Sequence, residues 1–399
     1  MDQETSRFDS IKIKGFRSLR AAELPLDALT AFIGPNGSGK SNFMDLLNLM
    51  AEASYGLLAD GIAKRGGFDN ISFKGDPGDV QIEFNFKPEG VFQEERTPVK
   101  FRLTLKRVGS YPRVWLEQIE KAPDAYHFKP LQLMRRDKDG CEFRSVKTGM
   151  TEELEKKALE SESELAIFQV KDKDKYPTPY KLLRLLQDWA FYRDINVGPN
   201  APIRQPDLVR PTVRLAADGG NLASVLYSIQ QQHPATWKEI EEILETVYPD
   251  FHSITFPPEG GDGKVLLRWW ERPFEKKSGF SASLLSDGTL KLLCLLAILK
   301  TPDPPPMICI DEPELGLHPD WIKVVAELLL SAATRTQIII ATHSPQLVSK
   351  LEPSNVVITE KSAGETRFRH LDKNSLKKWL EEFSLGDLWL AGHFGGRPA

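Results

Sequence analysis

Residues 34–41 read GPNGSGKS, and this stretch decides the fold expected for the whole chain. It is a full match to the pattern G-x-x-x-x-G-K-[ST]. The apolar run LTAFI at 29–33 precedes it and predicts a buried strand, and residues 42–50 follow with apolar side chains on one helical face. Because strand, glycine loop and helix occur in the order that the pattern requires, a chance glycine-rich turn is the weaker interpretation.

The loop has the residue types that a phosphate group needs. Glycines permit positive φ and close backbone approach, so successive N–H groups turn inward around phosphate oxygens at a helix N-terminus. Lys40 supplies a mobile positive charge for the β- and γ-phosphates, and the hydroxyl of Ser41 is placed to ligate Mg²⁺. We therefore predict an ATP and Mg²⁺ site. The residues predicted to contact the nucleotide here are Gly34, Pro35, Asn36, Gly37, Ser38, Gly39, Lys40, Ser41 and Asn42.

A second segment places two carboxylates at a strand end. The apolar run 307–310 (MICI) leads directly into Asp311 and Glu312, and α/β sheets bind ligands at the carboxyl ends of their strands. Asp311 is predicted to hold Mg²⁺ through its water shell, and Glu312 to orient or deprotonate the attacking water. Alone, such a run would more often be a solvated strand end, but the phosphate loop favours the catalytic interpretation.

Two further positions complete the predicted site. His343 ends the buried run QIIIATH and can donate a hydrogen bond to a γ-phosphate oxygen; the alternative is an ordinary surface or core histidine. Ser286 is a good N-cap for an apolar helix with Gly288 in its first turn, which gives a second anion site. Two such helix ends in one chain suggest a nucleotide held between two subunits, whereas an ordinarily capped core helix is the alternative.

The hydrophobic pattern divides the chain into three parts. Apolar residues alternate over 11–16, 80–86 and 99–105, which predicts strands, whereas periodicity weakens after 107 and the segment 151–168 predicts a helix. The last third alternates between strands and helices, which favours a largely parallel sheet. We expect an N-terminal lobe with the phosphate loop (1–106), a mixed and partly helical insertion (107–184), and a C-terminal lobe with the remaining motifs (185–399).

Composition excludes several classes of protein. The 399 residues carry a net charge of -4, which argues against coating nucleic acid by bulk charge. The three cysteines, Cys141, Cys294 and Cys309, match no metal-ligand spacing and indicate a reducing cytoplasm. No apolar run approaches the roughly 20 residues that span a bilayer, so a cytoplasmic protein without membrane insertion is expected.

Four motifs in this order, GPNGSGKS, LSDGT, ICIDEPELGLHP and IIATHSP, resemble the ABC-class ATPase heads of the SMC and RecF-like group. With IKIKGFRSL, RLAADGGNLASVL and FSLGDLWLAGHFGGRP, the chain looks more narrowly like OLD-type and related prokaryotic AAA-family (AAA_21-like) ATPases. The resemblance implies an α/β P-loop NTPase, a bilobed ABC-type ATPase head that dimerises head to head around two ATP molecules. It implies Asp311 as metal residue, Glu312 as water-activating residue and His343 as γ-phosphate sensor, with Ser286 and Gly288 capping the partner's nucleotide.

The sequence departs from these families in three ways. The signature reads LSDGT where transporter-type heads favour LSGGQ, so Asp287 replaces a glycine. The insertion is too short for the long heptad arms of SMC proteins. Many OLD-type proteins carry a C-terminal Toprim nuclease with a DxD cluster, and no DxD follows His343. Nuclease activity in this chain is therefore not expected.

Three functions are compatible with these features. The leading hypothesis is an ATP-driven homodimeric switch that governs DNA engagement or a separately encoded effector such as a Toprim-like nuclease, by resemblance in prokaryotic antiviral defence. A RecF-like repair ATPase without an effector is the second, and a transporter motor, disfavoured by the insertion and the GLHP segment, is the third.

One stretch of sequence bears on DNA. Residues 171–214 hold nine Lys/Arg against five Asp/Glu, interleaved with Trp189, Phe191 and Tyr192. A DNA-facing groove and a solvated charged face beside a buried aromatic helix both fit this pattern. Arg65 and Gln93 are interpreted as surface residues, with an accessory nucleotide or DNA contact as the alternative.

Overall fold

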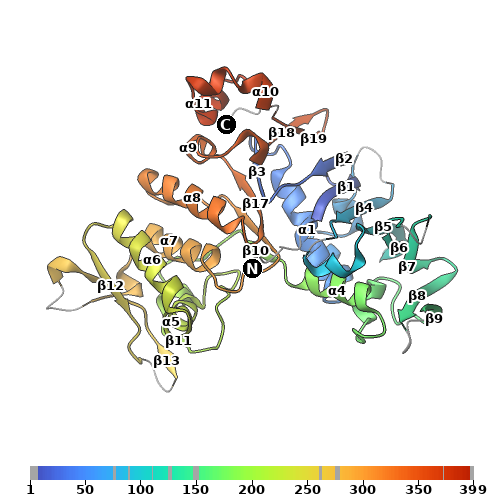
Figure 1. The fold of residues 1–399 in the computed structure, drawn as a ribbon, viewed down its shortest axis with the longest axis horizontal. Helices are drawn as coiled ribbons and strands as arrows, with labels where there is room; N and C mark the ends of the chain where they lie inside the picture. Colours follow the sequence, from blue (N-terminus) through green and yellow to red (C-terminus); the bar gives the residue numbers. More distant parts are fainter. Residues whose placement is uncertain are drawn as a thin grey trace. The chain divides into compact units, whose positions relative to one another are not determined.

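The structure is a computed structural model and divides into two compact units (Figure 1). Unit 1 takes its residues from 1–189, 353–374 and 392–399, and unit 2 from 190–352 and 375–391. The residues that the structure describes are 8–74, 78–88, 90–109, 111–124, 128–146, 152–259, 263–274, 279–371 and 373–395.

Unit 1 combines a large antiparallel sheet with a smaller group of strands and helices. Its strands are β1 (Phe8–Phe16), β2 (Leu19–Pro25), β3 (Leu29–Ile33), β4 (Val80–Phe86), β5 (Val99–Val108), β6 (Tyr111–Lys121), β7 (Leu131–Asp137), β8 (Gly140–Val146), β9 (Glu152–Lys157), β18 (Val356–Ser362) and β19 (Glu365–His370). Its helices are α1 (Lys40–Ser54), α2 (Leu58–Lys64), α3 (Phe68–Ile71) and α4 (Pro177–Gln187), with 3-10 turns η1 (Gly90–Glu95), η2 (Ala166–Gln169) and η7 (Pro353–Asn355). Helix α10 (Lys373–Leu376) crosses the boundary between the units.

Unit 2 contains the remaining elements. Its strands are β10 (Ala190–Tyr192), β11 (Asp207–Leu208), β12 (Phe251–Thr255), β13 (Lys264–Val265), β14 (Arg268–Glu271), β15 (Phe280–Ser281), β16 (Met307–Asp311) and β17 (Gln337–Thr342). Its helices are α5 (Leu222–Gln232), α6 (Pro234–Val247), α7 (Asp287–Leu299), α8 (Ile322–Ala332), α9 (Pro345–Val348) and α11 (Leu385–Leu390). Its 3-10 turns are η3 (Pro202–Arg204), η4 (Arg272–Phe274), η5 (Ala282–Leu284), η6 (Pro319–Trp321) and η8 (Trp379–Glu381).

The strand and helix predicted around the phosphate loop are confirmed. All five residues of β3 are buried, and β3 pairs in parallel with β18, which pairs antiparallel with β19. Phe32 of β3 and Phe43 of α1 have ring centroids 4.8 Å apart, and Phe368 of β19 lies 5.4 Å and 5.8 Å from them. This aromatic cluster fixes α1 against β3 and β19, because edge and tilted ring contacts to the half-buried Phe368 add to the burial of Phe32 and Phe43.

The eight-stranded sheet of unit 1 has the order β2-β1-β4-β5-β6-β7-β8-β9 (Figure 1). Its predicted strand pair is confirmed, because β4 and β5 are antiparallel with Val80 opposite Leu105 and Phe86 opposite Val99. The segment 107–184, expected as a mixed and partly helical insertion, belongs to unit 1, and its residues up to 157 extend this sheet through β6, β7, β8 and β9. Each strand from β6 to β9 pairs antiparallel with the strand that precedes it in the chain.

The helix predicted over 151–168 is wrong. Residues 152–157 form the strand β9, antiparallel to β8, and a 3-10 turn follows only at 166–169; Thr151 lies outside the described residues. The Glu- and Lys-rich sequence has high helical propensity, but pairing with the exposed edge of β8 overrides it. Charged residues on an edge strand also oppose further pairing with other chains.

Unit 2 contains the parallel strands predicted for the last third. β10, β16 and β17 are parallel, with Ile310 opposite Tyr192 on one side and opposite Ile340 on the other. The helix that precedes β10 ends at Gln187, and residues 190–192 form β10, which pairs with β16. A strand of three residues carries too little periodicity to be recognised from the sequence. Within the described residues, no helix has the length and apolar character needed to cross a membrane.

A buried carboxylate ties the end of the insertion segment to the large sheet. Glu117 of β6 is completely buried, and its two oxygens accept hydrogen bonds from the backbone N–H groups of Ala166 (2.6 Å) and Ile167 (3.0 Å). The neighbouring Arg136 donates to the carbonyls of Glu164 and Ser161. Burial raises the pKa of Glu117 to about 7, although the two backbone donors act in the opposite direction.

This carboxylate predicts a pH dependence of stability. Since the folded pKa of about 7 lies above the ordinary value of 4.5, the folded state binds the proton more tightly. The contribution of Glu117 to stability is therefore present below pH 4.5 and is lost as the pH rises through about 7. Urea unfolding of the wild type and Glu117→Gln at pH 5 and pH 8 measures it, since the subtraction cancels other titrating groups. The wild type should lose stability relative to the variant between these pH values; an equal difference at both would contradict the assignment.

Candidate functional site

The backbone of residues 34–39 has the conformation that a phosphate loop requires. Gly34 and Gly39 have φ angles of 147° and 114°, in the region that favours glycine. A Cβ atom on Gly39 would lie 2.1 Å from Oγ1 of Thr366, and one on Gly34 would lie 2.1 Å from the carbonyl oxygen of Thr359. Both positions are therefore restricted to glycine by backbone angle and by the strands β18 and β19 behind the loop.

The N-terminus of α1 is open to an anion. Its N-cap residue is Gly39, which has no side chain, and its first turn reads Lys-Ser-Asn-Phe, so no carboxylate competes for the helix N–H groups. Lys40 is buried, and its Nζ donates to the carbonyls of Gly34 (2.7 Å) and Pro35 (3.1 Å). Ser38 Oγ is buried and has no hydrogen-bond partner among the described residues. An orphaned hydroxyl, a lysine and a helix N-terminus fit a phosphate group.

Side chains from distant parts of unit 1 hold this loop. Thr366 Oγ1 donates to the carbonyl of Ser38 (2.6 Å) and lies 2.7 Å from the hydroxyl of Ser18. Asn42 Nδ2 donates to the same hydroxyl (2.7 Å). Asn42, predicted as a nucleotide contact, therefore has a supporting role within the unit. Ser18 lies within the quoted segment IKIKGFRSL, whereas Thr366 lies in no quoted motif and could not be found from a local pattern.

Arg65 is not a surface residue. Its side chain is 8% exposed, and its guanidinium forms ion pairs with Asp45 (2.9 Å) and Glu52 (2.5 Å), both on α1. Arg17 also pairs with Asp45 (2.9 Å). These ion pairs join α1 to the end of α2 and to the turn after β1. Charged residues that are rarely buried alone are paired here, as burial requires.

In unit 2, the two predicted acidic residues lie where β16 ends. Asp311 is the last residue of β16 and pairs with Ala341 of β17, and the backbone N–H of Glu312 donates to the carbonyl of Ala341 (2.8 Å). Glu312 has a φ of 49°, which is rare for a residue with a side chain. Such strain concentrates at functional sites, because the surrounding structure must hold it in place.

Glu314 joins the loop after β16 to the end of β17. Its Oε1 accepts hydrogen bonds from the hydroxyl of Thr342 (2.6 Å) and from the backbone N–H of His343 (3.0 Å). The carboxylate of Glu314 is poorly solvated, and this burial raises its pKa although the two donors act in the opposite direction. Glu314 thereby sets the backbone position of the predicted γ-phosphate sensor. Sequence reasoning missed it, although it lies within the quoted motif DEPELG.

The predicted N-cap at Ser286 is confirmed. Its Oγ accepts from the backbone N–H of Thr289 (3.1 Å), and α7 begins at the next residue. The hydroxyl of Tyr248 contacts the hydroxyl of Thr289, which also lies 2.7 Å from Ser286 Oγ. A Cβ atom on Gly288 would lie 2.8 Å from the carbonyl oxygen of Gly316. The LSDGT segment therefore packs directly against the DEPELG loop.

The structure groups the predicted site residues into two sets. Unit 1 gathers residues 34–42 around the N-terminus of α1. Unit 2 gathers Ser286, Gly288, Asp311, Glu312 and His343 around the loop 312–316, because that loop contacts both the signature segment and the end of β17.

Several cations of the basic stretch 171–214 are paired with carboxylates of the described residues. The ion pairs are Lys175 with Glu155, Lys181 with Glu94, Arg204 with Asp287 and Arg214 with Asp303. Trp189 and Tyr192 are buried, and Arg204 is 6% exposed. Residues 171–189 lie in unit 1 and the rest in unit 2. The structure thus favours the solvated-face interpretation over a DNA groove.

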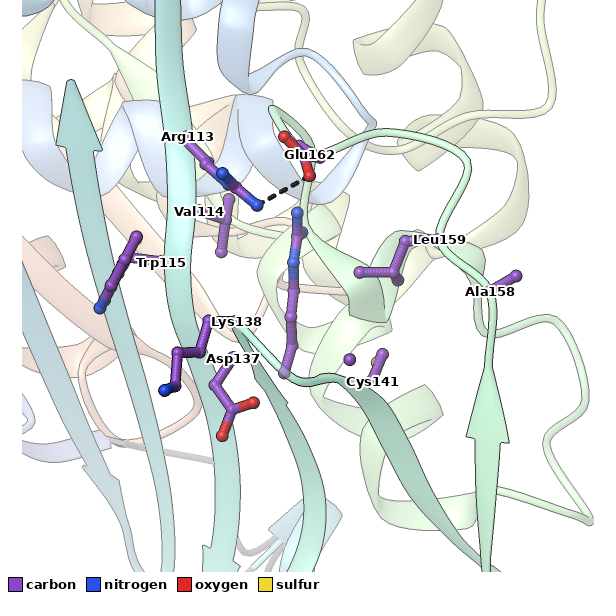
Figure 2. Close-up of a pocket in the computed structure, with 11 residues that line it drawn as sticks. Arg113, Val114, Trp115, Asp137, Lys138, Cys141, Ala158, Leu159 and Glu162 are labelled. Atoms are coloured by element: carbon purple, nitrogen blue, oxygen red, sulfur yellow. Dashed lines mark hydrogen bonds and ion pairs between the residues drawn. The ribbon is translucent and has the colours of Figure 1, made fainter. Parts of the chain in front are cut away.

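A cavity of about 280 Å³ lies elsewhere in unit 1, between β6, β7, β8 and the segment after β9 (Figure 2). Arg113 and Glu162 form an ion pair of 2.8 Å at its rim, as Figure 2 shows. Arg136, which donates to the carbonyls of Ser161 and Glu164, also lines it. The cavity contains none of the predicted site residues.

Known proteins with this fold identify the class of the chain. Residues 29–349 match the AAA_21 family, whose description is "AAA domain, putative AbiEii toxin, Type IV TA system". A Chromosome partition protein Smc of Methanocaldococcus jannaschii is 22% identical over 218 residues, which are 52% of this chain and 17% of that protein. The chain thus spans less than a fifth of that relative.

Two solved structures share the fold at low sequence identity. One is an Smc head bound to the C-winged helix domain of ScpA, with a TM-score of 0.56, 15% identity and coverage of 92% of this chain and 99% of that one. The other is an Smc head with an extended coiled coil, bound to the C-terminal domain of ScpA and derived from Pyrococcus furiosus, with a TM-score of 0.54, 14% identity and coverage of 94% and 99%.

The fold and motifs define an ABC-class P-loop ATPase of the SMC and RecF-like group. Within this class, the chain belongs to the AAA_21 family, whose match includes the phosphate loop, the signature segment and both acidic residues.

The orphaned hydroxyl of Ser38 leads to a prediction in which stability and affinity change in opposite directions. Ser38→Ala removes a buried unsatisfied group, so the nucleotide-free protein should gain up to about 1 kcal/mol of unfolding free energy. The same change removes a hydrogen bond to phosphate and should weaken ATP binding roughly tenfold. Thermal unfolding without nucleotide and calorimetric titration with ATP measure the two effects.

Lys40→Ala is the reference variant for this experiment, because it should abolish ATP binding altogether. Unchanged nucleotide affinity in Lys40→Ala would overturn the phosphate-loop assignment, and unchanged affinity in Ser38→Ala alone would remove only the hydroxyl from the site.

Proposed function

We propose that the chain is a Mg²⁺-dependent ATP-hydrolysing switch that closes head to head with a second copy around two ATP molecules. The observation that carries the proposal is the open N-terminus of α1, where Lys40 and the orphaned hydroxyl of Ser38 meet. A buried polar group without a partner is costly unless a ligand satisfies it. The family match supports ATP as that ligand.

The chemistry follows from the acidic residues and the histidine of unit 2. The carboxylate of Glu312 accepts a proton from the attacking water as general base, and its strained backbone holds it at one orientation. His343, positioned by Glu314, donates a hydrogen bond to the γ-phosphate. Ser41 and Asp311 are the residues that would hold Mg²⁺, and the metal would neutralise charge on the phosphate oxygens. Lys40 stabilises the same charge from the phosphate loop.

Dimerisation is supported by the surface around the signature segment. Leu284 and Leu315 are 72% and 57% exposed, and they belong to the two loops that meet where Gly288 packs against Gly316. Contiguous exposed apolar patches mark protein interaction sites, and we propose that the second copy covers these two leucines. In the proposed dimer, Ser286 and Gly288 contact the ATP held by Lys40 of the other copy.

We propose that the closed and open states are read by a separately encoded protein, in the setting of prokaryotic antiviral defence and in the cytoplasm. The family description names a toxin of a TA system, which supports a defence setting. The three cysteines are buried thiols and none forms a disulfide, which supports a reducing compartment. A protein effector, such as a Toprim-like nuclease, is favoured over DNA because several of the nine cations in 171–214 are paired within the chain.

Glu312→Gln tests the proposal. The amide keeps the size of the side chain but accepts no proton, so ATP should bind with wild-type affinity while turnover falls by roughly 100-fold or more. Sedimentation with ATP and Mg²⁺ should show the variant as a stable dimer, whereas Lys40→Ala stays monomeric. Wild-type turnover in Glu312→Gln would remove this residue from the catalytic role, and a monomer at saturating ATP would contradict head-to-head closure.

A further inference from the structure

One buried arginine organises the loop that contains the signature. Arg204 of η3 is 6% exposed and donates six hydrogen bonds. Nε donates to the carbonyls of Val197 and Gly198, and NH2 donates to Oδ1 of Asp287 at 2.5 Å. NH1 donates to the carbonyls of Ala282 (3.1 Å), Ser283 (3.2 Å) and Leu285 (2.7 Å).

These contacts fix the chain immediately before α7. The carbonyls of 282–285 belong to the 3-10 turn η5 and the residue after it, and Ser286 then caps the helix. One guanidinium therefore satisfies the carbonyl groups of this short turn, because its planar arrangement of N–H groups can donate to several acceptors at once. Without it, three clustered carbonyls and one carboxylate would lose a shared donor.

The ion pair between Arg204 and Asp287 compensates the negative charge in the LSDGT signature. Asp287 stands where transporter-type signatures have glycine, and a carboxylate in this position would repel a nucleotide phosphate. Its side chain is 65% exposed to solvent. The guanidinium of Arg204 lies against one of its oxygens and supplies an opposite charge from the buried side.

We infer that Arg204 is the positioning residue of the signature loop. Its guanidinium holds the loop by donating to the backbone carbonyls of 282, 283 and 285, and it neutralises the carboxylate of Asp287. Both effects allow the loop to accept the nucleotide of a second copy. The inference rests on the proposed head-to-head function. It predicts a residue whose loss leaves the phosphate loop of unit 1 intact but disables the surface that faces the other copy.

Arg204→Ala is the primary test, in the full chain. ATP affinity should stay within about twofold of wild type, because Lys40 and Ser38 are untouched, while ATP-dependent dimerisation in the Glu312→Gln background and turnover in the wild-type background both fall at least tenfold. Hydrogen exchange should accelerate at the amides of 282–290.

A second-site variant separates charge from loop order. In Arg204→Ala the carboxylate of Asp287 is left uncompensated, so Arg204→Ala/Asp287→Asn should recover part of the lost dimerisation, and added salt should help Arg204→Ala more than the double variant. A residue that merely stabilised unit 2 would give no such recovery. No recovery, together with no difference in salt response, would overturn the neutralising role.

Arg335 offers a matched control at the other end of the same helix. Its NH1 and NH2 donate to the carbonyls of Thr301 and Leu299, both at 2.8 Å, where α7 ends. Arg335→Ala should lower the unfolding temperature in the manner of Arg204→Ala, but dimerisation and exchange at 282–290 should stay as in the wild type. Equal losses of dimerisation in both variants would show a general loss of stability and overturn the inference.

The readouts distinguish this inference from the proposed function. If the wild type dimerises and hydrolyses ATP while Arg204→Ala does so equally well, the inference fails and the proposed function stands. If the wild type neither dimerises nor hydrolyses ATP, both fail, and hydrogen exchange then reports only whether Arg204 orders the loop. Unchanged exchange at 282–290 in Arg204→Ala overturns the positioning role whatever ATP does.

Discussion

The structure of unit 1 depends on keeping a glycine loop open at the N-terminus of a helix. Left-handed glycines have no intrinsic preference for one conformation, so other parts of the chain must hold the loop. Thr366 does this through the carbonyl of Ser38, and the cluster of Phe32, Phe43 and Phe368 fixes the helix behind it. The result is a helix N-terminus without an acidic residue in its first turn, beside which the buried hydroxyl of Ser38 has no partner among the described residues.

In unit 2, contacts of side chains and of two glycines hold the loops that contain the predicted site residues. Three motifs without regular structure of their own meet around the loop 312–316, and each is fixed by a specific contact. Glu314 bonds to the end of β17, Gly288 packs against Gly316, and Arg204 serves the carbonyls before α7. The three motifs are therefore connected by direct contacts around one loop.

Sequence reasoning was reliable where a local pattern and a physical requirement coincide. The strand, loop and helix around Lys40, the paired strands 80–86 and 99–105, and the N-cap at Ser286 all follow from periodicity and capping chemistry. It failed at 151–168, where strand pairing overrode helical propensity. It also misjudged Arg65 and assigned no individual role to Arg204, since a count of charges does not reveal which carboxylate lies next to an arginine in space.

The sequence by itself determined the class of the protein, because phosphate binding needs glycines, a lysine and a hydroxyl at fixed spacing, and local spacing is what a sequence records. Only the tertiary structure decided which residues support that chemistry. Thr366 lies 328 positions from Ser38, and Arg204 lies 83 positions from Asp287. Such partners carry no motif of their own, since hydrogen bonding depends on distance in space and folding alone brings these groups together.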